Sequence, residues 1–240
     1  AKSIKFKHND SNHSESLLKK YRKKYFHCFI LTEGVFSMDG DRGKIKELAF
    51  LANKYDASII LDDAHGFGVL GNGRGSLHEY TPIPEILVQM GTLSKAIGSY
   101  GGFVTASKTI IRLLHNKARS LIYTTGLPPG ILAASIKSLE IIMSNSKITN
   151  KPYQYAKLFC KIAKLPTPES SIVSIIMHSE ENAIKASKLF EKYGYYIGAI
   201  RPPTVPMNTS RLRFTFSSAH KKKDIINLAE HAKNILKRLN

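Results

Sequence analysis

The residues best suited to chemistry are a lysine and an aspartate that each follow a short apolar run. Lys95 stands among small residues in the sequence GTLSKAIG, residues 91–98. Asp62 ends the apolar run ASIIL at residues 57–61. An amine flanked by small residues can form an imine with an aldehyde cofactor, and a carboxylate can keep the pyridine nitrogen of that cofactor protonated. The pairing predicts a site for pyridoxal phosphate, the electron sink for carbanion chemistry.

The first 146 residues alternate between short apolar runs and amphipathic stretches. Buried strands are expected at 25–32, 57–62 and 86–90, with a return strand at 101–106. Helices are expected at 45–55, 108–117 and 131–143. Such alternation is typical of a mostly parallel sheet covered by helices on both faces. Because ligands bind these sheets at the carboxyl ends of the strands, Asp62, His65 and Lys95 are expected to lie together.

A polar stretch at 144–152 lacks an apolar period and marks a change in organisation. Helices are expected after it at 153–163, 181–193 and 222–239, and strands at 172–177, 196–200 and 212–216. The predicted fold class is therefore α/β, with a large domain in residues 1–146 and a small α+β domain in residues 147–240.

The bulk composition is that of an ordinary globular protein. The chain has 240 residues, of which 42% are hydrophobic and 22% charged. Cys28 and Cys160 are far apart and have no metal-ligand spacing, which argues against a disulfide scaffold or a zinc site and fits a reducing compartment. No apolar stretch approaches the roughly 20 residues that span a bilayer, and the N-terminus has no apolar signal core. We expect a cytoplasmic protein without a membrane segment or metal.

The chain is strongly basic, with 36 basic and 18 acidic residues and a formal charge of +18. Dispersed lysines usually form solvated helix faces, which is one interpretation. The other is that the surface attracts an acidic partner. Nucleic acid is not expected, because no recognition motif with interleaved aromatic residues is present. A phosphorylated thioester or an acidic carrier protein remains as a candidate.

Three motifs together resemble the α-oxoamine synthase family. They are TEGVFSMDGD at 32–41, DDAHGFGVLG at 62–71 and GTLSK at 91–95. The resemblance runs nearly end to end and implies an incomplete fold-type-I pyridoxal-phosphate transferase, an enzyme that joins an amino acid to an acyl thioester with loss of carbon dioxide. The stretches AIRPPTVP at 199–206 and SRLRFT at 210–215 most resemble the branch that condenses L-alanine with pimeloyl-CoA or a pimeloyl carrier protein to 8-amino-7-oxononanoate, in biotin biosynthesis.

The resemblance implies roles for the residues around the cofactor. Lys95 would form the imine and then remove the α-proton of the bound amino acid. Asp62 would pair with the pyridinium nitrogen, with Asp63 as its rival, and the family pattern favours the aspartate three residues before the histidine. His65 and Ser37 would hydrogen-bond the phenolic oxygen, although a serine in a turn often caps backbone instead.

The same resemblance implies the phosphate and substrate contacts. Thr92 would bind the phosphate through its hydroxyl, in a loop that opens a helix and supplies backbone donors. Thr124 would reach the phosphate of a neighbouring subunit, which implies a homodimer with shared sites. Arg213 would clamp the substrate carboxylate with two parallel hydrogen bonds. Arg211 is the alternative, because residues two apart on a strand point the same way.

One departure from the family affects the whole prediction. The resemblance begins near His8, inside the family sequence, and the N-terminal third that supplies early strands and a stacking histidine has no counterpart. A sheet without those strands exposes an unpaired edge and apolar surface. We therefore expect this chain alone to bind cofactor weakly and turn over poorly. Two alternatives stay open: a related oxoamine synthase that is similar to glycine C-acetyltransferase, and a non-catalytic fragment that binds a partner.

Overall fold

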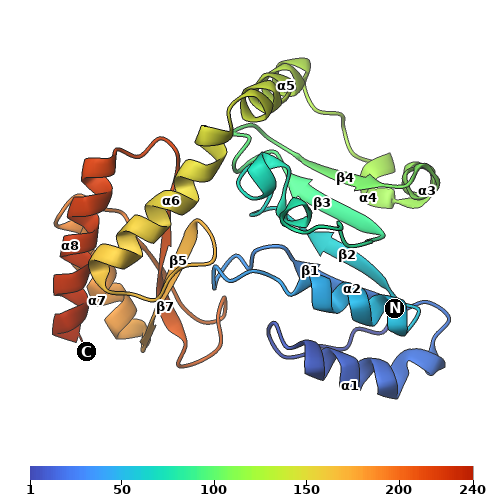
Figure 1. Cartoon of the computed structure of the whole chain (residues 1–240), viewed down its shortest axis with the longest axis horizontal. Helices are drawn as coiled ribbons and strands as arrows, with labels where there is room; N and C mark the ends of the chain where they lie inside the picture. The colour runs from blue at the N-terminus through green and yellow to red at the C-terminus, as the bar shows by residue number, and fades with distance from the viewer. Residues whose placement is uncertain (240) are drawn as a thin grey trace. The chain divides into compact units, whose positions relative to one another are not determined.

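The computed structural model describes residues 1–239, which form two compact units (Figure 1). The first unit contains Ala1–Val35 and Gly43–Asn145, and the second contains Phe36–Arg42 and the chain from Ser146 onward. The sequence predicted a boundary after residue 146, next to the observed one between Asn145 and Ser146. It did not indicate that residues 36–42 belong with the second unit. The helices in residues 1–239 include none that combines the length and the apolar character of a membrane span.

The first unit is built on a mixed, mostly parallel sheet in the order β1-β2-β3-β4. Its strands are β1 (Phe29–Glu33), β2 (Ser58–Asp62), β3 (Val88–Thr92) and β4 (Gly102–Ala106). The first two pairings are parallel, and β4 returns antiparallel to β3, as predicted. The sequence placed β1 at 25–32, but Tyr25 and Phe26 are exposed and lie outside the sheet. It ended β3 at Met90, whereas pairing with β4 extends this strand to Thr92.

Helices and short turns complete the first unit. The helices are α1 (Ser11–Tyr21), α2 (Ile45–Lys54), α3 (Lys108–Lys117), α4 (Arg119–Ile122) and α5 (Pro129–Ser144). The 3₁₀ turns are η1 (Arg22–Lys24), η2 (Gly71–Gly73) and η3 (Ser76–Glu79). The sequence did not predict α1 as a separate element. Asp10 caps the start of α1, where its carboxylate accepts a hydrogen bond from the His13 N–H at 2.8 Å, and Leu18 of this helix is buried in the core of the unit.

The sheet of the first unit is packed on one face and open on the other. Its core consists of Leu18, Ile30, Ile45, Leu48, Leu51, Ala52, Ile59, Leu61 and Leu77. On the opposite face Leu31 is 64% exposed, Val104 42% and Met90 36%. The prediction that helices cover both faces is therefore wrong for the described residues. Strand alternation places Asp62 on this open face, because it pairs in register with Met90.

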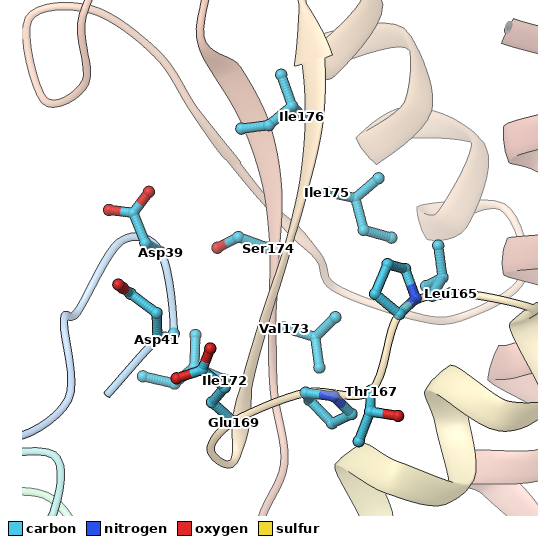
Figure 2. Close-up of a pocket in the computed structure, with 13 residues that line it drawn as sticks. Asp39, Asp41, Leu165, Thr167, Glu169, Ile172, Val173, Ser174, Ile175 and Ile176 are labelled. Carbon is cyan, nitrogen blue, oxygen red and sulfur yellow. The ribbon is translucent and has the colours of Figure 1, made fainter. Parts of the chain in front are cut away.

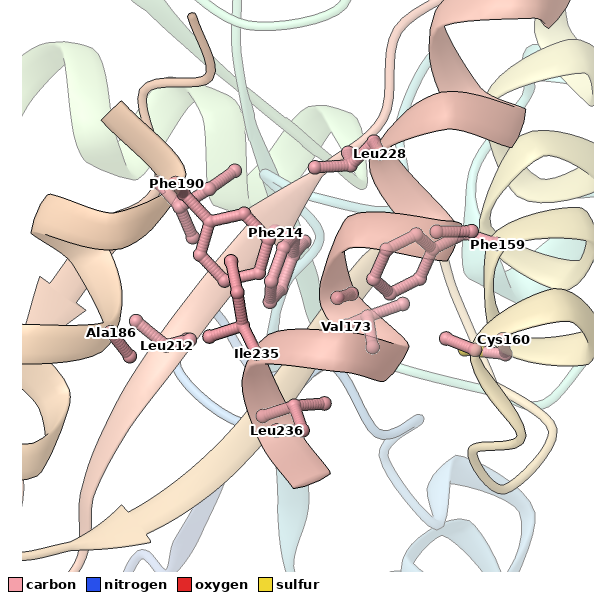
Figure 3. Packing of buried hydrophobic residues seen from close by; sticks show 14 of the residues in the cluster. Phe159, Cys160, Val173, Ala186, Phe190, Leu212, Phe214, Leu228, Ile235 and Leu236 are labelled. Atoms are coloured by element: carbon pink, nitrogen blue, oxygen red, sulfur yellow. The ribbon is translucent and has the colours of Figure 1, made fainter. Parts of the chain in front are cut away.

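The second unit is an α+β layer with a closed core (Figure 3). Its antiparallel sheet has the order β5-β7-β6, formed by β5 (Ile172–His178), β6 (Gly198–Ile200) and β7 (Ser210–Thr215). Its helices are α6 (Ser146–Ala163), α7 (Glu180–Glu191) and α8 (Lys222–Leu239). Phe159, Phe190 and Phe214 are almost fully buried, and the ring of Phe214 contacts the rings of the other two. The sequence began α6 after Pro152, because residues 144–152 are polar and lack an apolar period. The helix instead starts at Ser146 and buries that proline.

Candidate active site

Lys95 lies on a tight loop that joins β3 to β4. The Leu93 N–H donates to the Gly101 carbonyl at 2.9 Å, and the Ser99 N–H donates to the Leu93 carbonyl at 2.8 Å. The Lys95 carbonyl accepts from the Gly98 N–H at 3.0 Å, while the Lys95 side chain is exposed. The loop is thus fixed by its own backbone and leaves the amine accessible.

Hydroxyl groups tie this loop to α5. The Ser99 Oγ donates to the Ile131 carbonyl at 3.2 Å, and the Ser135 Oγ lies 2.8 Å from the Ser99 Oγ. Ser135 itself is buried. Sequence reasoning missed both serines, since small polar residues in turns and helices carry no distinctive pattern.

Thr92 ends β3 three residues before the lysine. Its hydroxyl donates to the Gly101 carbonyl at 3.1 Å and lies 2.8 Å from the Ser94 Oγ. The Ser94 N–H also approaches the Thr92 Oγ1 at 3.3 Å. The expected helix after this loop is not formed among the described residues, because β4 follows the turn directly. Donors for an anion here would come from two hydroxyls and the loop backbone and not from a helix N-terminus.

Asp62 occupies the carboxyl end of β2, beside the strand that leads to Lys95. Its Oδ1 accepts a hydrogen bond from the Ala64 N–H at 2.9 Å, and its side chain is half-buried. Because β2 and β3 are parallel, their carboxyl ends lie at one edge of the sheet. One carboxylate oxygen, Oδ2, is left for a ligand at that edge.

The loop after Asp62 packs against the lysine loop. Gly68 has a φ of +79°, and an added Cβ there would come within 2.5 Å of the Ala96 Cβ. The rings of Phe67 and Phe103 meet at a centroid distance of 4.8 Å. His65, which is half-buried, lies between Asp62 and this contact along the chain. The first unit therefore brings Asp62, His65, Thr92 and Lys95 to one edge of its sheet.

Asp63 differs from Asp62 in its exposure to solvent and in its hydrogen bonds, and both properties govern access to a ligand. It has no exposed surface, and its Oδ2 accepts from the Ser76 N–H at 2.8 Å and from the Gln89 Nε2 at 2.9 Å. Burial raises the pKa of Asp63. A carboxyl group enclosed in this way faces no ligand, which supports Asp62 for the cofactor contact.

Thr124 lies in an exposed segment between α4 and α5. Tyr123 beside it is 77% exposed, and further along the segment the Leu127 side chain packs close to Gly101 at the end of the lysine loop. The exposure is compatible with the predicted contact to a second subunit, which stays a prediction.

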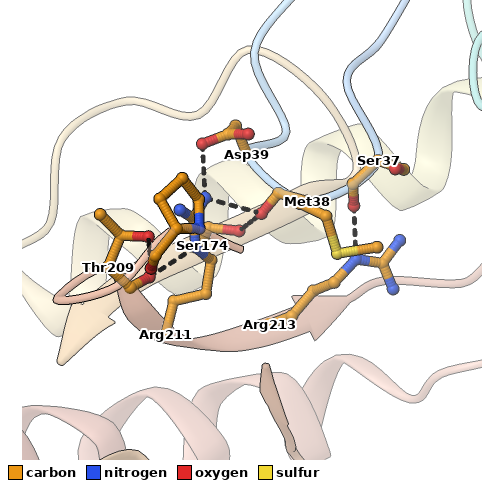
Figure 4. Close-up of polar contacts among 8 residues, drawn as sticks. Ser37, Met38, Asp39, Ser174, Thr209, Arg211 and Arg213 are labelled. Carbon is orange, nitrogen blue, oxygen red and sulfur yellow. Dashed lines mark hydrogen bonds and ion pairs between the residues drawn. The ribbon is translucent and has the colours of Figure 1, made fainter. Parts of the chain in front are cut away.

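The two arginines of β7 in the second unit are held differently (Figure 4). Arg211 is 4% exposed and forms an ion pair with Asp39. Arg213 is half-buried, and its Nε donates to the Ser37 carbonyl at 2.6 Å. Burial lowers the pKa of Arg213. The Arg211 guanidinium is thus already paired inside the second unit, which favours Arg213 as the residue that binds the substrate carboxylate.

A pocket of about 350 Å³ also lies in the second unit (Figure 2). It is formed by β5 residues, by the loop before β5, and by Asp39, Gly40 and Asp41. None of the residues predicted for chemistry lines it. The acidic groups at its rim are engaged elsewhere, since Asp39 pairs with Arg211, and we assign no ligand to it.

Residues 1–231 match the family Aminotransferase class I and II. The chain is 45% identical over 237 residues to the 8-amino-7-oxononanoate synthase of Methylocella silvestris, covering 99% of this chain and 67% of that protein. It is 45% identical to the enzyme of the same name from Granulibacter bethesdensis, covering 98% and 61%. The chain thus spans about two thirds or less of these curated relatives.

Solved structures share its fold. Serine palmitoyltransferase from S. paucimobilis, solved with a bound PLP–myriocin adduct, superimposes with a TM-score of 0.92 at 26% identity, covering 98% of this chain and 61% of that one. The 8-amino-7-oxononanoate synthase of Francisella tularensis gives a TM-score of 0.77 at 28% identity, with coverages of 98% and 69%. These likenesses identify a fold-type-I transferase architecture, of which this chain contains part.

Proposed function

The chain belongs to the aminotransferase class I and II family, and from this we propose that it carries the lysine side of a pyridoxal-phosphate site. The complete enzyme would condense L-alanine with a pimeloyl thioester, from CoA or a carrier protein, to 8-amino-7-oxononanoate. The relatives that bear this name, at 45% identity over nearly all of this chain, support the substrate assignment.

The observation that carries the proposal is the single sheet edge that holds Asp62, His65, Thr92 and Lys95. Parallel pairing of β2 with β3 and the contact of Gly68 with Ala96 bring them there. The groups fit the cofactor: an exposed amine for its aldehyde, a carboxylate oxygen for its ring nitrogen, and the hydroxyls of Thr92 and Ser94 for its phosphate. When bound, pyridoxal phosphate supplies the electron sink for a carbanion at the α-carbon.

The protein groups would then bind, orient and move a proton. The Lys95 amine is exposed on a loop fixed by backbone bonds, so it can reach both the cofactor aldehyde and the α-proton of the amino acid. Asp62 would keep the ring nitrogen protonated, which strengthens its pull on electrons. His65 and Ser37 would hydrogen-bond the phenolic oxygen, and Arg213 would hold the substrate carboxylate by its planar guanidinium.

The assembly and the acyl donor complete the proposal. We infer a homodimer in which Thr124 contributes to the partner's site, consistent with its exposed segment. The charge of +18 suits an anionic acyl carrier, whether CoA or carrier protein. The two unpaired cysteines fit the cytoplasm.

A second candidate uses another amino acid. The fold superimposes well on serine palmitoyltransferase, so an oxoamine synthase that takes serine or glycine is the rival. The stretch at 199–206 favours alanine in the resemblance, but within residues 1–239 no recorded contact selects the side chain of the amino acid.

Titration of the chain with pyridoxal phosphate, followed by absorbance, tests the proposal. We expect weak but saturable binding that Lys95→Ala abolishes and that Lys108→Ala, at an exposed helix start, leaves unchanged. Adding L-alanine should shift the spectrum at lower concentration than glycine or L-serine. Equal binding by Lys95→Ala would overturn the cofactor assignment, and preference for serine or glycine would establish the rival.

A further inference from the structure

We propose that Asp63 is a positioning residue whose buried carboxyl group joins β2, β3 and the start of η3, and thereby fixes Asp62 and His65. The inference rests on the proposed function, because those two residues are the ones assigned to the cofactor. Asp63 itself touches no ligand in this assignment.

The hydrogen bonds of Asp63 link three parts of the first unit. Its Oδ2 accepts from the Ser76 N–H, at the start of η3, and from the Gln89 side chain on β3. Its own N–H donates to the Met90 carbonyl at 2.8 Å, which continues the pairing of β2 with β3. Its carbonyl accepts from the Phe67 N–H at 2.8 Å, which closes the turn that contains His65.

Three glycines make room for this one carboxyl group. A Cβ added at Gly34 or Gly66 would overlap the Asp63 Oδ1, and a Cβ added at Gly75 would overlap the Oδ2. Gly75 also has a φ of +103°, which side chains rarely adopt. The chain therefore wraps backbone around the carboxyl on three sides, and a longer acid has no space.

Two buried oxygens at this point lack a well-aligned partner. They are the Asp63 Oδ1 and the Ser76 Oγ, and both lie against the same position at Gly34. A Cβ added at Gly34 would lie 2.3 Å from the first and 2.4 Å from the second, so the two oxygens are near neighbours. One hydrogen bond between them would satisfy both atoms, donated either by the Ser76 hydroxyl to the carboxylate or by a protonated Asp63 to the Ser76 Oγ.

The surroundings of Asp63 raise its pKa above the ordinary value for an aspartate. Burial is the main cause of the raised pKa, and the nearby charge of Asp62 raises it further. Ser76 and Gln89 act in the opposite direction as neutral hydrogen-bond donors, and no cation is among these influences. A buried carboxylate without a cation is costly, and protonation removes that cost. Asp63 thus holds the neighbouring elements by hydrogen bonds and close packing, whereas Asp62 supplies the negative charge at the site.

The test compares Asp63→Asn, Asp63→Glu, Asp63→Ala and Asp62→Asn in the full 240-residue chain. Asparagine keeps the shape: its Oδ1 can accept from Ser76 N–H and Gln89, and its Nδ2 can donate to the Ser76 Oγ. We expect Asp63→Asn to stay within about 2–4 °C of the wild-type unfolding midpoint. Asp63→Glu and Asp63→Ala should lower the midpoint by about 5–10 °C, through overpacking or two unpaired buried donors.

Cofactor capture should separate the positioning role from a merely structural one. Among folded proteins, Asp63→Asn should bind pyridoxal phosphate within about threefold of wild type, whereas Asp63→Glu should lose about tenfold or more, a loss of about 1.4 kcal/mol per factor of ten. Asp62→Asn should keep the midpoint and lose the cofactor. If Asp63→Asn loses cofactor as Asp62→Asn does, Asp63 acts through charge and the proposal is overturned. If Asp63→Glu or Asp63→Ala loses only stability, the role is structural alone.

A readout without cofactor keeps this inference distinct from the proposed function. In NMR spectra of the apo protein, the amide of Ala64 reports its bond to Asp62, and the amide of His65 reports the turn. Both should keep their shifts in Asp63→Asn and move in Asp63→Glu. Unmoved amides in Asp63→Glu would refute the positioning role even if wild type captured no pyridoxal phosphate, in which case the proposed function would fail separately.

Discussion

The second unit closes its core, whereas the first unit leaves one face of its sheet open. In the second unit, the exposed fraction of Phe159 is 0% and that of Phe214 is 1%. In the first unit Leu31 and Met90 remain on an exposed face, next to the edge that carries Asp62. The lysine side of the candidate site thus belongs to the less completely packed unit, whereas Ser37 and Arg213 belong to the unit with the closed core. This contrast agrees with a chain that spans about two thirds or less of its curated relatives.

The largest expected effect contrasts buried and exposed apolar side chains. Phe214→Ala should destabilise the second unit by about 3–5 kcal/mol, because it leaves a cavity among packed rings. Leu31→Ala removes a side chain that is 64% exposed, so the free energy of unfolding should change by no more than about 0.5 kcal/mol. Urea unfolding of both variants checks this. A large loss for Leu31→Ala would mean that the open face is covered in solution.

The two arginines of β7 allow a buried side chain to be compared with a half-buried one inside the second unit. Arg211→Ala should cost about 2–3 kcal/mol of unfolding free energy, because it removes a buried guanidinium that donates to the Thr209 and Met38 carbonyls. Arg213→Ala should cost about 1 kcal/mol, for the lost bond to the Ser37 carbonyl. If Arg213 binds the substrate carboxylate, Arg213→Ala should weaken the spectral shift caused by L-alanine, and Arg211→Ala should not. The reverse pattern would assign that role to Arg211.

Two glycines test the packing of the lysine loop. Gly68→Ala places a methyl group against Ala96, so we expect about 1–3 kcal/mol of destabilisation and weaker cofactor capture. Gly98→Ala has a similar φ, +66°, but meets open space, so it should cost only about 1 kcal/mol. Thermal unfolding and cofactor titration distinguish the two. Equal effects would show that the contact between the loops contributes nothing.

Acid titration probes the smallest effect. Hydrogen bonds from Lys54 and Tyr55 lower the pKa of Glu15 from 4.5 to about 2. A depressed pKa in the folded state means that its contribution is complete above pH 4.5 and is lost as the pH falls toward 2. Wild type should therefore lose slightly more stability than Glu15→Gln between pH 5 and 2. If the stabilities of wild type and Glu15→Gln fell in parallel with pH, the hydrogen bonds from Lys54 and Tyr55 to Glu15 would be contradicted.

Much of the fold was readable from periodicity, and the failures have physical causes. The bounds of α3 and α8 were predicted correctly, because their apolar residues recur at helical spacing. The helix α1 carries almost no apolar period and depends on a cap at Asp10 and on tertiary burial of Leu18. The start of α6 was missed, because burial of Pro152 outweighs its local preference.

The candidate site was predictable by residue type but not by orientation. The pairs Asp62/Asp63 and Arg211/Arg213 could not be separated from spacing alone. Strand parity separates the first pair, since Leu61 and Asp63 are buried on the packed side and Asp62 lies on the other. Burial separates the second pair. Neither property is visible until the covered face of each sheet is known.

The most direct test of the central claim is to trap the cofactor and locate it. The chain is incubated with pyridoxal phosphate and reduced with borohydride, and its peptides are then analysed by mass spectrometry. We predict that the adduct concentrates on the peptide containing Lys95 and disappears from that peptide in Lys95→Ala, even though binding is weak. An adduct spread over the many surface lysines, unchanged by Lys95→Ala, would contradict the account.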